Sequence, residues 1–215
     1  MIWAQDTADL CAQSDVLILS TRPEDFPQPG FDGAGKLVIS FMTAWSLDRL
    51  ASLCPGARIV RAMPNGAASV GRSFTPWVAG AGLGSDEAAV VRRLLSAMGE
   101  EAQVETEAQL DYLSALSGSA YSALMAQAML ADALVRGLPQ AVAERAVASV
   151  LASGGALAAD TSGIDAMIQT YLDYRGVTAA GMQAALEAGL APSITKALAA
   201  ATAKARALTE RGIGG

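Results

Sequence analysis

A chain of 215 residues with a formal net charge of −6 is long enough to bury a sizeable core, and its negative charge disfavours nucleic acid and anionic membrane surfaces as partners. The absence of histidine excludes histidine-based triads, zinc sites with histidine ligands and a histidine acid or base. Two cysteines are too few for a disulfide framework and no apolar run reaches the roughly 18 residues of a membrane span, so we expect a cytoplasmic protein without a metal site.

Strand and helix signals alternate in the first half of the chain. We expect short helices at residues 6–13 and 46–53, and a longer helix from Ser85, as its N-cap, to about Met98. The predicted strands are at residues 15–20, 36–41, 58–62 and 73–79, of which the first is a continuous apolar strand of the buried parallel kind. Strands that alternate with helices predict a parallel, doubly wound sheet.

No strand signal remains after about Glu107, and apolar residues recur at helical spacing, as at Tyr121, Leu124 and Met125. We expect further helices at residues 140–152, 166–173, 181–189 and 193–210, with an interruption at Gly154 and Gly155. The pattern predicts an α/β domain at residues 1–105 and an all-α domain at 106–215. The second half is rich in alanine and poor in charge, so we expect a second copy of the chain to cover it.

The run from Ile59 to Gly66 (IVRAMPNG) predicts a buried strand that ends at a turn. Proline has no N–H to donate, so the ladder ends at Pro64, and Asn65 can then present its carboxamide to a ligand. Open α/β sheets bind ligands at the carboxyl ends of their strands. An ordinary turn at the end of a strand is the alternative.

Three further segments have polar groups at positions suited to a ligand. Residues 20–23 (STRP) follow a buried strand, where Arg22 can meet a phosphate; a solvated arginine is the alternative. Residues 117–119 (SGS) allow close approach of a ligand or of another helix. A helix starting near Thr178 aims free N–H groups at an anion such as a carboxylate, unless Thr178 is simply its N-cap.

The glycine-rich segment at residues 80–85 (GAGLGS) lies between a predicted strand and a predicted helix. Its spacing is GxGxG instead of the GxGxxG of a dinucleotide fingerprint, and no acidic residue ends a strand about 20 residues later. We therefore interpret it as a flexible connection.

Taken in chain order, these motifs resemble those of the pyrroline-5-carboxylate reductase family. Residues 17–23 (LILSTRP) resemble a strand that ends in Lys-Pro, with Arg22 in place of lysine. Residues 60–65 (VRAMPN) match the family's Arg-x-Met-Pro-Asn motif, and residues 115–121 (ALSGSAY) resemble ALSGSGPAY with two residues fewer. Gly176, Thr178 and Gly181 fall on the family signature, and residues 189–208 resemble its last helix.

The resemblance implies a partial Rossmann-like NAD(P)-binding domain at residues 1–105 and a helical dimerisation and substrate domain at 106–215. It implies hydride transfer from NADPH or NADH to the C=N carbon of a cyclic imine, as in proline biosynthesis, by a homodimer or a larger homo-oligomer. The implied cofactor-binding residues are Ser20, Thr21, Arg22, Pro23, Met63, Pro64 and Asn65. The implied substrate-binding residues are Ser117, Ser119, Arg175, Gly176, Val177 and Thr178, with Thr178 as the catalytic residue.

Two departures from the family pattern affect these expectations. The sequence begins partway through the Rossmann domain, with residues 1–3 as the remnant of a strand and no glycine fingerprint, so we expect weak cofactor binding or none. Residues 173–175 (DYR) stand where the family has Ser-Pro-Gly, and Asp173 would repel a substrate carboxylate unless Arg175 neutralises it.

Two other classes of protein remain as alternatives. One is a non-catalytic or degenerate dimeric paralogue that keeps the fold but not cofactor binding. The other is a β-hydroxyacid dehydrogenase, which needs a catalytic lysine on its first interdomain helix. We rank it last, because the chain has only Lys36, Lys196 and Lys204.

Overall fold

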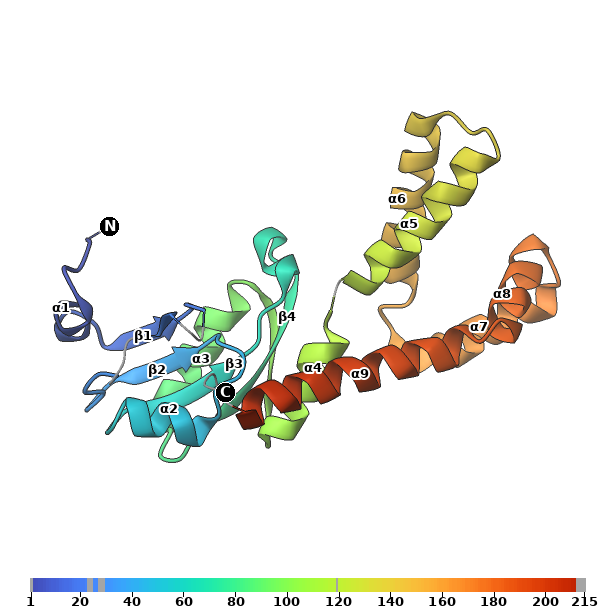
Figure 1. Ribbon diagram of the computed structural model, residues 1–215. Helices are drawn as coiled ribbons and strands as arrows, with labels where there is room; N and C mark the ends of the chain where they lie inside the picture. Colours follow the sequence, from blue (N-terminus) through green and yellow to red (C-terminus); the bar gives the residue numbers. More distant parts are fainter. Residues whose placement is uncertain (1, 23–24, 27–29, 119, 212–215) are drawn as a thin grey trace. The chain divides into compact units, whose positions relative to one another are not determined.

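The computed structural model describes residues 2–22, 25–26, 30–118 and 120–211 (Figure 1). The chain forms two compact units: residues 1–118 together with the C-terminal part from residue 198 make the first, and residues 119–197 make the second. The domain boundary predicted at residues 105 and 106 falls at the end of the sheet. It remains a prediction, because compactness does not show which part folds by itself.

The first unit is built on a five-stranded sheet with the strands in sequence order. The strands are β1 (Val16–Leu19), β2 (Leu37–Ser40), β3 (Arg58–Ala62), β4 (Ser73–Ala79) and β5 (Gly99–Val104). The four predicted strands are confirmed, and β1, β2 and β3 are parallel to one another. A parallel sheet was predicted throughout. This is wrong for one pair of strands, because β4 runs antiparallel to β3. Only a short 3-10 helix, Gly66–Val70, lies between them, and a parallel crossover needs a dozen residues or more.

The fifth strand was not predicted. Its sequence, GEEAQV, has two adjacent glutamates and no apolar run, so it lacks the usual signal of a strand. The strand lies at the edge of the described sheet, where it pairs in parallel with β4. There Glu101 accepts a hydrogen bond from Nε1 of Trp77 at 2.5 Å. An edge strand with one side to solvent tolerates such a polar sequence.

Helices cover both faces of the sheet. On one face Val38 and Ile59 pack with Trp45 and with Leu50 of α2 (Leu47–Leu53), and α1 (Thr7–Ala12) adds Cys11. On the other face, the neighbouring strand residues Ile39 and Val60 pack with Trp77 and with Val91 and Leu95 of α3 (Ser85–Ser96). Alternate residues of each strand therefore enter opposite cores, which confirms the doubly wound arrangement.

Ser85 was predicted to be the N-cap of α3. This is wrong, because the N-cap is Gly84 and Ser85 is the first residue of the helix. The N–H of Gly84 donates to Oε2 of Glu87 at 3.1 Å, so the carboxylate of Glu87 closes the first turn in place of a serine hydroxyl. A fourth helix of this unit, α4 (Glu107–Leu116), follows β5.

The second unit is entirely helical in its described part. It contains α5 (Ala120–Val135), α6 (Gln140–Leu157), the 3-10 helix Thr161–Gly163, α7 (Ile164–Tyr174), α8 (Val177–Glu187) and the first turns of α9 (Leu190–Arg211). The predicted interruption at Gly154 and Gly155 is wrong, because α6 continues through both glycines to Leu157. Each glycine costs about 1 kcal/mol relative to alanine, which the surrounding helix formers offset.

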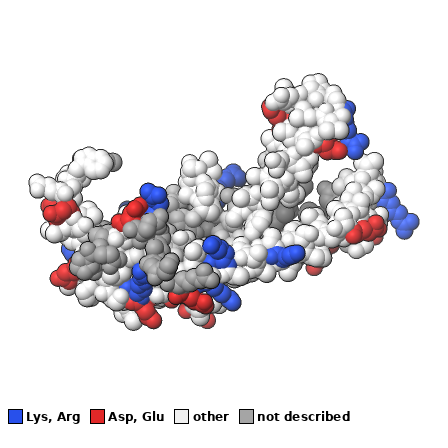
Figure 2. Space-filling view, in the orientation of Figure 1, with Lys and Arg blue, Asp and Glu red and all other residues white. Residues whose placement is uncertain are grey.

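Much of the apolar surface of this unit is exposed. No residue of α5 is buried, and Leu124, Met125, Val142 and Val150 are among the large apolar side chains open to solvent. On the face shown in Figure 2, α5 and α6 have few charged side chains between their ends. No single described helix is long and apolar enough to cross a membrane; α6 and residues 161–174 together reach that length and composition, but they are bent by 89°.

The hydroxyl groups of the last helix, α9, bond to its own backbone. Those of Thr195, Thr202 and Thr209 donate to the carbonyl oxygens four residues earlier, at 2.8–3.2 Å. Ser193 does the same with Gly189 at 2.8 Å. Each of these polar groups therefore has a partner within the helix itself.

Candidate functional site

The polar motifs that follow β1 and β3 lie at one edge of the sheet. Because β1, β2 and β3 are parallel, their carboxyl ends meet there. Residues 20–22 leave β1 and residues 63–65 leave β3, while Met42 follows β2 between them. The hydroxyl of Thr21 donates to Sδ of Met42 at 3.3 Å, which ties the first two strand ends together. This edge is where sheets of this kind bind ligands.

Ser20, Thr21 and Arg22 are exposed at this edge, as a residue that meets a ligand must be. Nε of Arg22 donates to Oδ2 of Asp25 at 3.0 Å, and both side chains are largely in solvent. Such an exposed ion pair contributes little to stability, so Arg22 can exchange Asp25 for a phosphate at small cost. Pro23, the fourth residue of this motif, lies outside the described residues.

The carboxamide of Asn65 is held at both ends. Its Oδ1 accepts the N–H of Ala67 at 2.9 Å and so caps the 3-10 helix that follows. Its Nδ2 donates to the carbonyl oxygen of Ser117 at 3.2 Å. The backbone N–H of Asn65 donates to the hydroxyl of Ser73 at 3.1 Å. The structure thus brings the strand-end motif and the SGS motif together, although Ser119 lies outside the described residues.

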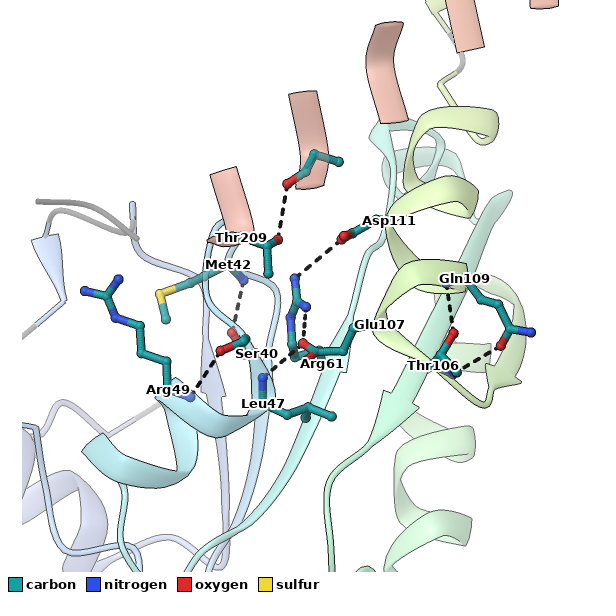
Figure 3. A network of polar contacts seen from close by, with 12 residues as sticks. Ser40, Met42, Leu47, Arg49, Arg61, Thr106, Glu107, Gln109, Asp111 and Thr209 are labelled. Carbon is teal, nitrogen blue, oxygen red and sulfur yellow. Dashed lines mark hydrogen bonds and ion pairs between the residues drawn. The ribbon is translucent and has the colours of Figure 1, made fainter. Parts of the chain in front are cut away.

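A largely buried cluster of charges between β3 and the start of α4 was not predicted (Figure 3). Arg61, on β3, is 1% exposed, and its Nη1 pairs with Oε1 of Glu107 in the first turn of α4. Nη2 lies 4.0 Å from Oδ1 of Asp111, one turn later in the same helix. Oε1 of Glu107 also accepts the N–H of Leu47, the first residue of α2, at 3.0 Å. The sequence did contain a signal for this cluster: a cation inside an apolar strand, together with two acidic residues four positions apart on a helix.

Asp111 borders a cavity of about 210 Å³ within the first unit. The cavity is also lined by Arg61 and Met63, and by Lys204 and Leu208 of α9. Burial raises the pKa of Asp111 above its usual value, although the nearby guanidinium of Arg61 opposes this rise. Arg206 also lowers the pKa, while Glu107 and Glu210 add to the rise. The charged form of Asp111 is therefore less favourable here than in water.

We expect the Asp111→Asn variant to gain stability relative to the wild type as the pH rises from about 4 to 7. The native protein holds the Asp111 proton more tightly than the unfolded chain does, so this contribution to stability is complete at low pH and is lost as the pH rises through the native pKa. Urea denaturation over this pH range measures the difference. Parallel stability curves for the two proteins would contradict it.

Glu87 provides the matched control with the opposite sign. A hydrogen bond from Arg58, assisted by the N–H of Gly84, lowers the pKa of Glu87. Its contribution is present above the pKa of the unfolded chain and is lost as the pH falls through the native pKa. We therefore expect Glu87→Gln to lose stability relative to the wild type over the same rise in pH.

The remaining motif, the segment around Thr178, joins α7 and α8 in the second unit. Arg175 ends α7 in the left-handed conformation with φ of 54°, and Gly176 is the N-cap of α8. Thr178 is thus the second residue of the helix and not its N-cap, and its side chain is exposed. The N–H groups of Val177 and Thr178 have no acceptor within the helix, because they belong to its first turn. They can therefore donate to an anion.

Two neighbours limit what this connection tolerates. A Cβ atom on Gly176 would lie 2.9 Å from Cδ1 of Tyr174, so the exposed ring of Tyr174 would have to move to admit a larger residue there. Oδ1 of Asp173 accepts a hydrogen bond from Nε2 of Gln169 at 2.8 Å, within α7. The carboxylate of Asp173 therefore has a neutral partner on its own helix, which leaves its predicted repulsion of a substrate carboxylate in place.

We expect Arg175→Gly to raise the free energy of unfolding of the helical unit by about 0.5–1 kcal/mol, because only glycine adopts a positive φ without strain. Thermal unfolding followed by circular dichroism measures this. Arg145→Gly is the control: it places glycine inside α6 and should cost about 1 kcal/mol. Equal losses in the two variants would show that the left-handed conformation imposes no strain on Arg175.

Comparison with known proteins gives a consistent set of relatives. Residues 107–208 match the family described as pyrroline-5-carboxylate reductase dimerisation. The pyrroline-5-carboxylate reductase of Synechocystis sp. is 30% identical over 213 residues, which cover 96% of this chain and 79% of the relative. That of Vibrio alginolyticus is 27% identical, with 93% of this chain and 77% of the relative covered.

Solved structures agree with this result. A 1-pyrroline-5-carboxylate reductase from Streptococcus pyogenes matches with a TM-score of 0.82 and 28% identity, covering 95% of this chain and 80% of the other. A pyrroline carboxylate reductase from Plasmodium falciparum with NADP bound has the same fold, with a TM-score of 0.82 at 18% identity and coverage of 94% and 79%. The predicted fold, a partial Rossmann-like sheet domain followed by a helical dimerisation domain, is thereby confirmed.

Proposed function

Because this chain belongs to the pyrroline-5-carboxylate reductase family, we propose that it reduces a cyclic imine by transfer of a hydride from NADPH or NADH to the C=N carbon. Pyrroline-5-carboxylate, which gives L-proline, is the first substrate to consider. One observation supports the proposal best. The exposed polar residues after β1 and the fixed carboxamide of Asn65 after β3 lie at the same edge of the sheet, the edge at which such sheets bind ligands.

The residues at this edge suit a dinucleotide. Arg22 is exposed and has only a weak partner in Asp25, so it can bind a phosphate, and Ser20 and Thr21 add hydroxyl groups. Met63, Pro64 and Asn65 supply the turn after β3. The nicotinamide cofactor, when bound, supplies the hydride. Pro23 completes the proposed set of cofactor-binding residues.

The chemistry asks the protein for positioning and for a dry site. In our proposal the N–H groups at the start of α8, with Arg175, Gly176 and Val177, bind the substrate carboxylate. Thr178 holds the imine side of the ring through its hydroxyl. Ser117 and Ser119 complete the substrate site. None of these roles needs a histidine, and the chain has none.

A homodimer, or a larger homo-oligomer, fits the exposed apolar residues of the helical unit. A second copy that packs on α5 and α6 would cover side chains such as Leu124 and Val150. The match of residues 107–208 to a dimerisation family supports the same arrangement. We propose that the protein works in the cytoplasm, with neither nucleic acid nor membrane as a partner.

Fluorescence titration of NADPH, then NADH, into the purified protein tests the proposal first. Trp3, Trp45 and Trp77 serve as energy-transfer donors. Saturable binding in the micromolar range, followed by imine-dependent oxidation of NADPH, is the expected result. Thr178→Ala should lower turnover and leave the Kd for NADPH unchanged. Absence of binding up to millimolar cofactor would reject the proposed activity for this chain.

A non-catalytic dimeric paralogue is the second candidate. The connection between α7 and α8 favours this candidate. Arg175 takes a left-handed conformation there, at a position where the family pattern has glycine, so the proposed substrate segment departs from the family pattern. An intact dimer in analytical ultracentrifugation, together with no cofactor binding, would favour this candidate over the reductase.

A further inference from the structure

Helix α4 is fastened to the sheet at both of its ends by polar side chains. At its start Glu107 pairs with Arg61 of β3 and accepts the N–H of Leu47. At its end the carbonyl oxygen of Ser117 accepts Nδ2 of Asn65. Figure 3 shows Glu107 and Asp111 pointing from one helix toward the same guanidinium. All of these groups lie in the first compact unit.

Between these ends the contact is apolar. Leu110 is completely buried and packs against Met63 and Val78. Apolar packing draws a helix onto a sheet but is tolerant of small sliding movements, since it has no preferred direction. The ion pairs at Arg61 and the hydrogen bond at Ser117 have direction, so they determine where along the sheet α4 rests.

Arg61 is poorly explained as a source of stability alone. It is buried, its Nε has no hydrogen-bond partner among the described residues, and its contact with Asp111 is a long one at 4.0 Å. An apolar side chain of similar volume often serves a core as well as a buried ion pair does. In several proteins a buried ionic or polar group instead selects one arrangement among several.

The arrangement selected here decides the orientation of Asn65. With Oδ1 accepting from Ala67 and Nδ2 donating to Ser117, a rotation of the carboxamide by half a turn would oppose two donors on one side and two acceptors on the other. If α4 moved away, the acceptor at Ser117 would be lost, and only the N–H of Ala67 would still restrict the carboxamide.

We propose that Arg61 is a positioning residue, which with Glu107 and Asp111 holds α4 so that Ser117 fixes the carboxamide of Asn65 at the cofactor edge. Arg61 acts through Asn65 and does not itself contact the cofactor. The functional half of this inference depends on the reductase function proposed above, whereas its structural half does not.

The test compares Arg61→Met, Glu107→Gln and Asn65→Ala with the wild type, and uses Arg136→Met as the matched control. Arg136 directly follows α5 and pairs with Asp132 of that helix, and both side chains are exposed, so its loss removes an arginine from an ion pair in the second unit, whereas Asn65 belongs to the first. The first measurement is the NMR signal of the Asn65 side-chain amide, assigned by its loss in Asn65→Ala. It needs no cofactor and therefore succeeds or fails independently of the proposed function.

We expect Arg61→Met to shift the two Asn65 side-chain amide proton signals toward the values of a solvent-exposed carboxamide, while Arg136→Met leaves them unchanged. Where Arg61→Met fails to fold, Glu107→Gln decides, since it keeps an acceptor for Leu47 but removes the charge that faces Arg61. Unchanged Asn65 signals in a folded Arg61→Met protein, or in Glu107→Gln where that variant decides, would overturn the proposal.

The second measurement is the Kd for NADPH in a double-mutant cycle. We expect Arg61→Met to weaken binding at least about tenfold in the wild-type background, and at most about threefold in Asn65→Ala, because its effect passes through Asn65. Equal losses in both backgrounds would overturn the positioning role and leave a structural one. A wild type that does not bind NADPH would reject the reductase function, and the NMR measurement alone would then decide the inference.

Discussion

Replacing Trp77 with alanine is expected to lower the free energy of unfolding by about 3–5 kcal/mol, the usual cost of removing a buried aromatic ring. Trp77 is completely buried on β4 and packs between the strands and α3. Its Nε1 donates to Glu101, and the guanidinium of Arg92 lies 5.2 Å from the centre of its ring. The alanine variant therefore also loses a link between β4 and β5. Urea denaturation followed by circular dichroism, at one fixed protein concentration, measures the change.

Trp3→Ala is the matched control, because Trp3 is 85% exposed. Its effect should stay within about 0.5 kcal/mol, as is usual for a surface position. If the two variants lost similar amounts of stability, the core assigned to this face of the sheet would be wrong.

Leu110→Ala should cost about 2–5 kcal/mol, since Leu110 fills the space between α4, Met63 and Val78. The cavity left behind also lies between the two polar attachments of α4, so the variant should weaken the hold on Asn65. The free energy of unfolding measures the first effect. Faster hydrogen exchange of the α4 amides should accompany it.

Leu116→Ala makes the same change on the same helix. Leu116 is 47% exposed, so we expect a loss of less than about 1 kcal/mol and little change in hydrogen exchange. An equal or larger loss from Leu116 would show that α4 buries its other face.

Strands with a strong apolar signal could be predicted from the sequence, and strands defined by their neighbours could not. Residues 37–39 form an unbroken apolar run because both faces of β2 are covered, so their pattern alone identifies the strand. β5 has glutamates as its second and third residues, and it becomes a strand by pairing with β4. The direction of β4 likewise depends on the short connection after β3. The pattern of alternating strands and helices, on which the prediction of a parallel sheet was based, does not include the length of that connection.

In the candidate site, too, local sequence effects could be predicted and contacts between distant residues could not. The motif after β3 was identified because proline and asparagine have local effects on the backbone. Its contact with Ser117 joins residues far apart in sequence, so it depends on the packing of α4. Arg61 was missed for a related reason. A cation in a strand suggests an exposed position until the helix that supplies its two carboxylates is in place.

The hydroxyl groups of α9 have a consequence for how this helix meets its surroundings. Thr195, Thr202 and Thr209 are spaced by two turns and so lie along one stripe, with every hydroxyl proton directed at the helix backbone. What each threonine then offers to a neighbour is chiefly its methyl group. Burial of this stripe needs no hydroxyl to be stripped of water and left without a partner, so hydropathy scales overestimate its polarity. Thr202, which is 9% exposed, is an instance already buried in this way.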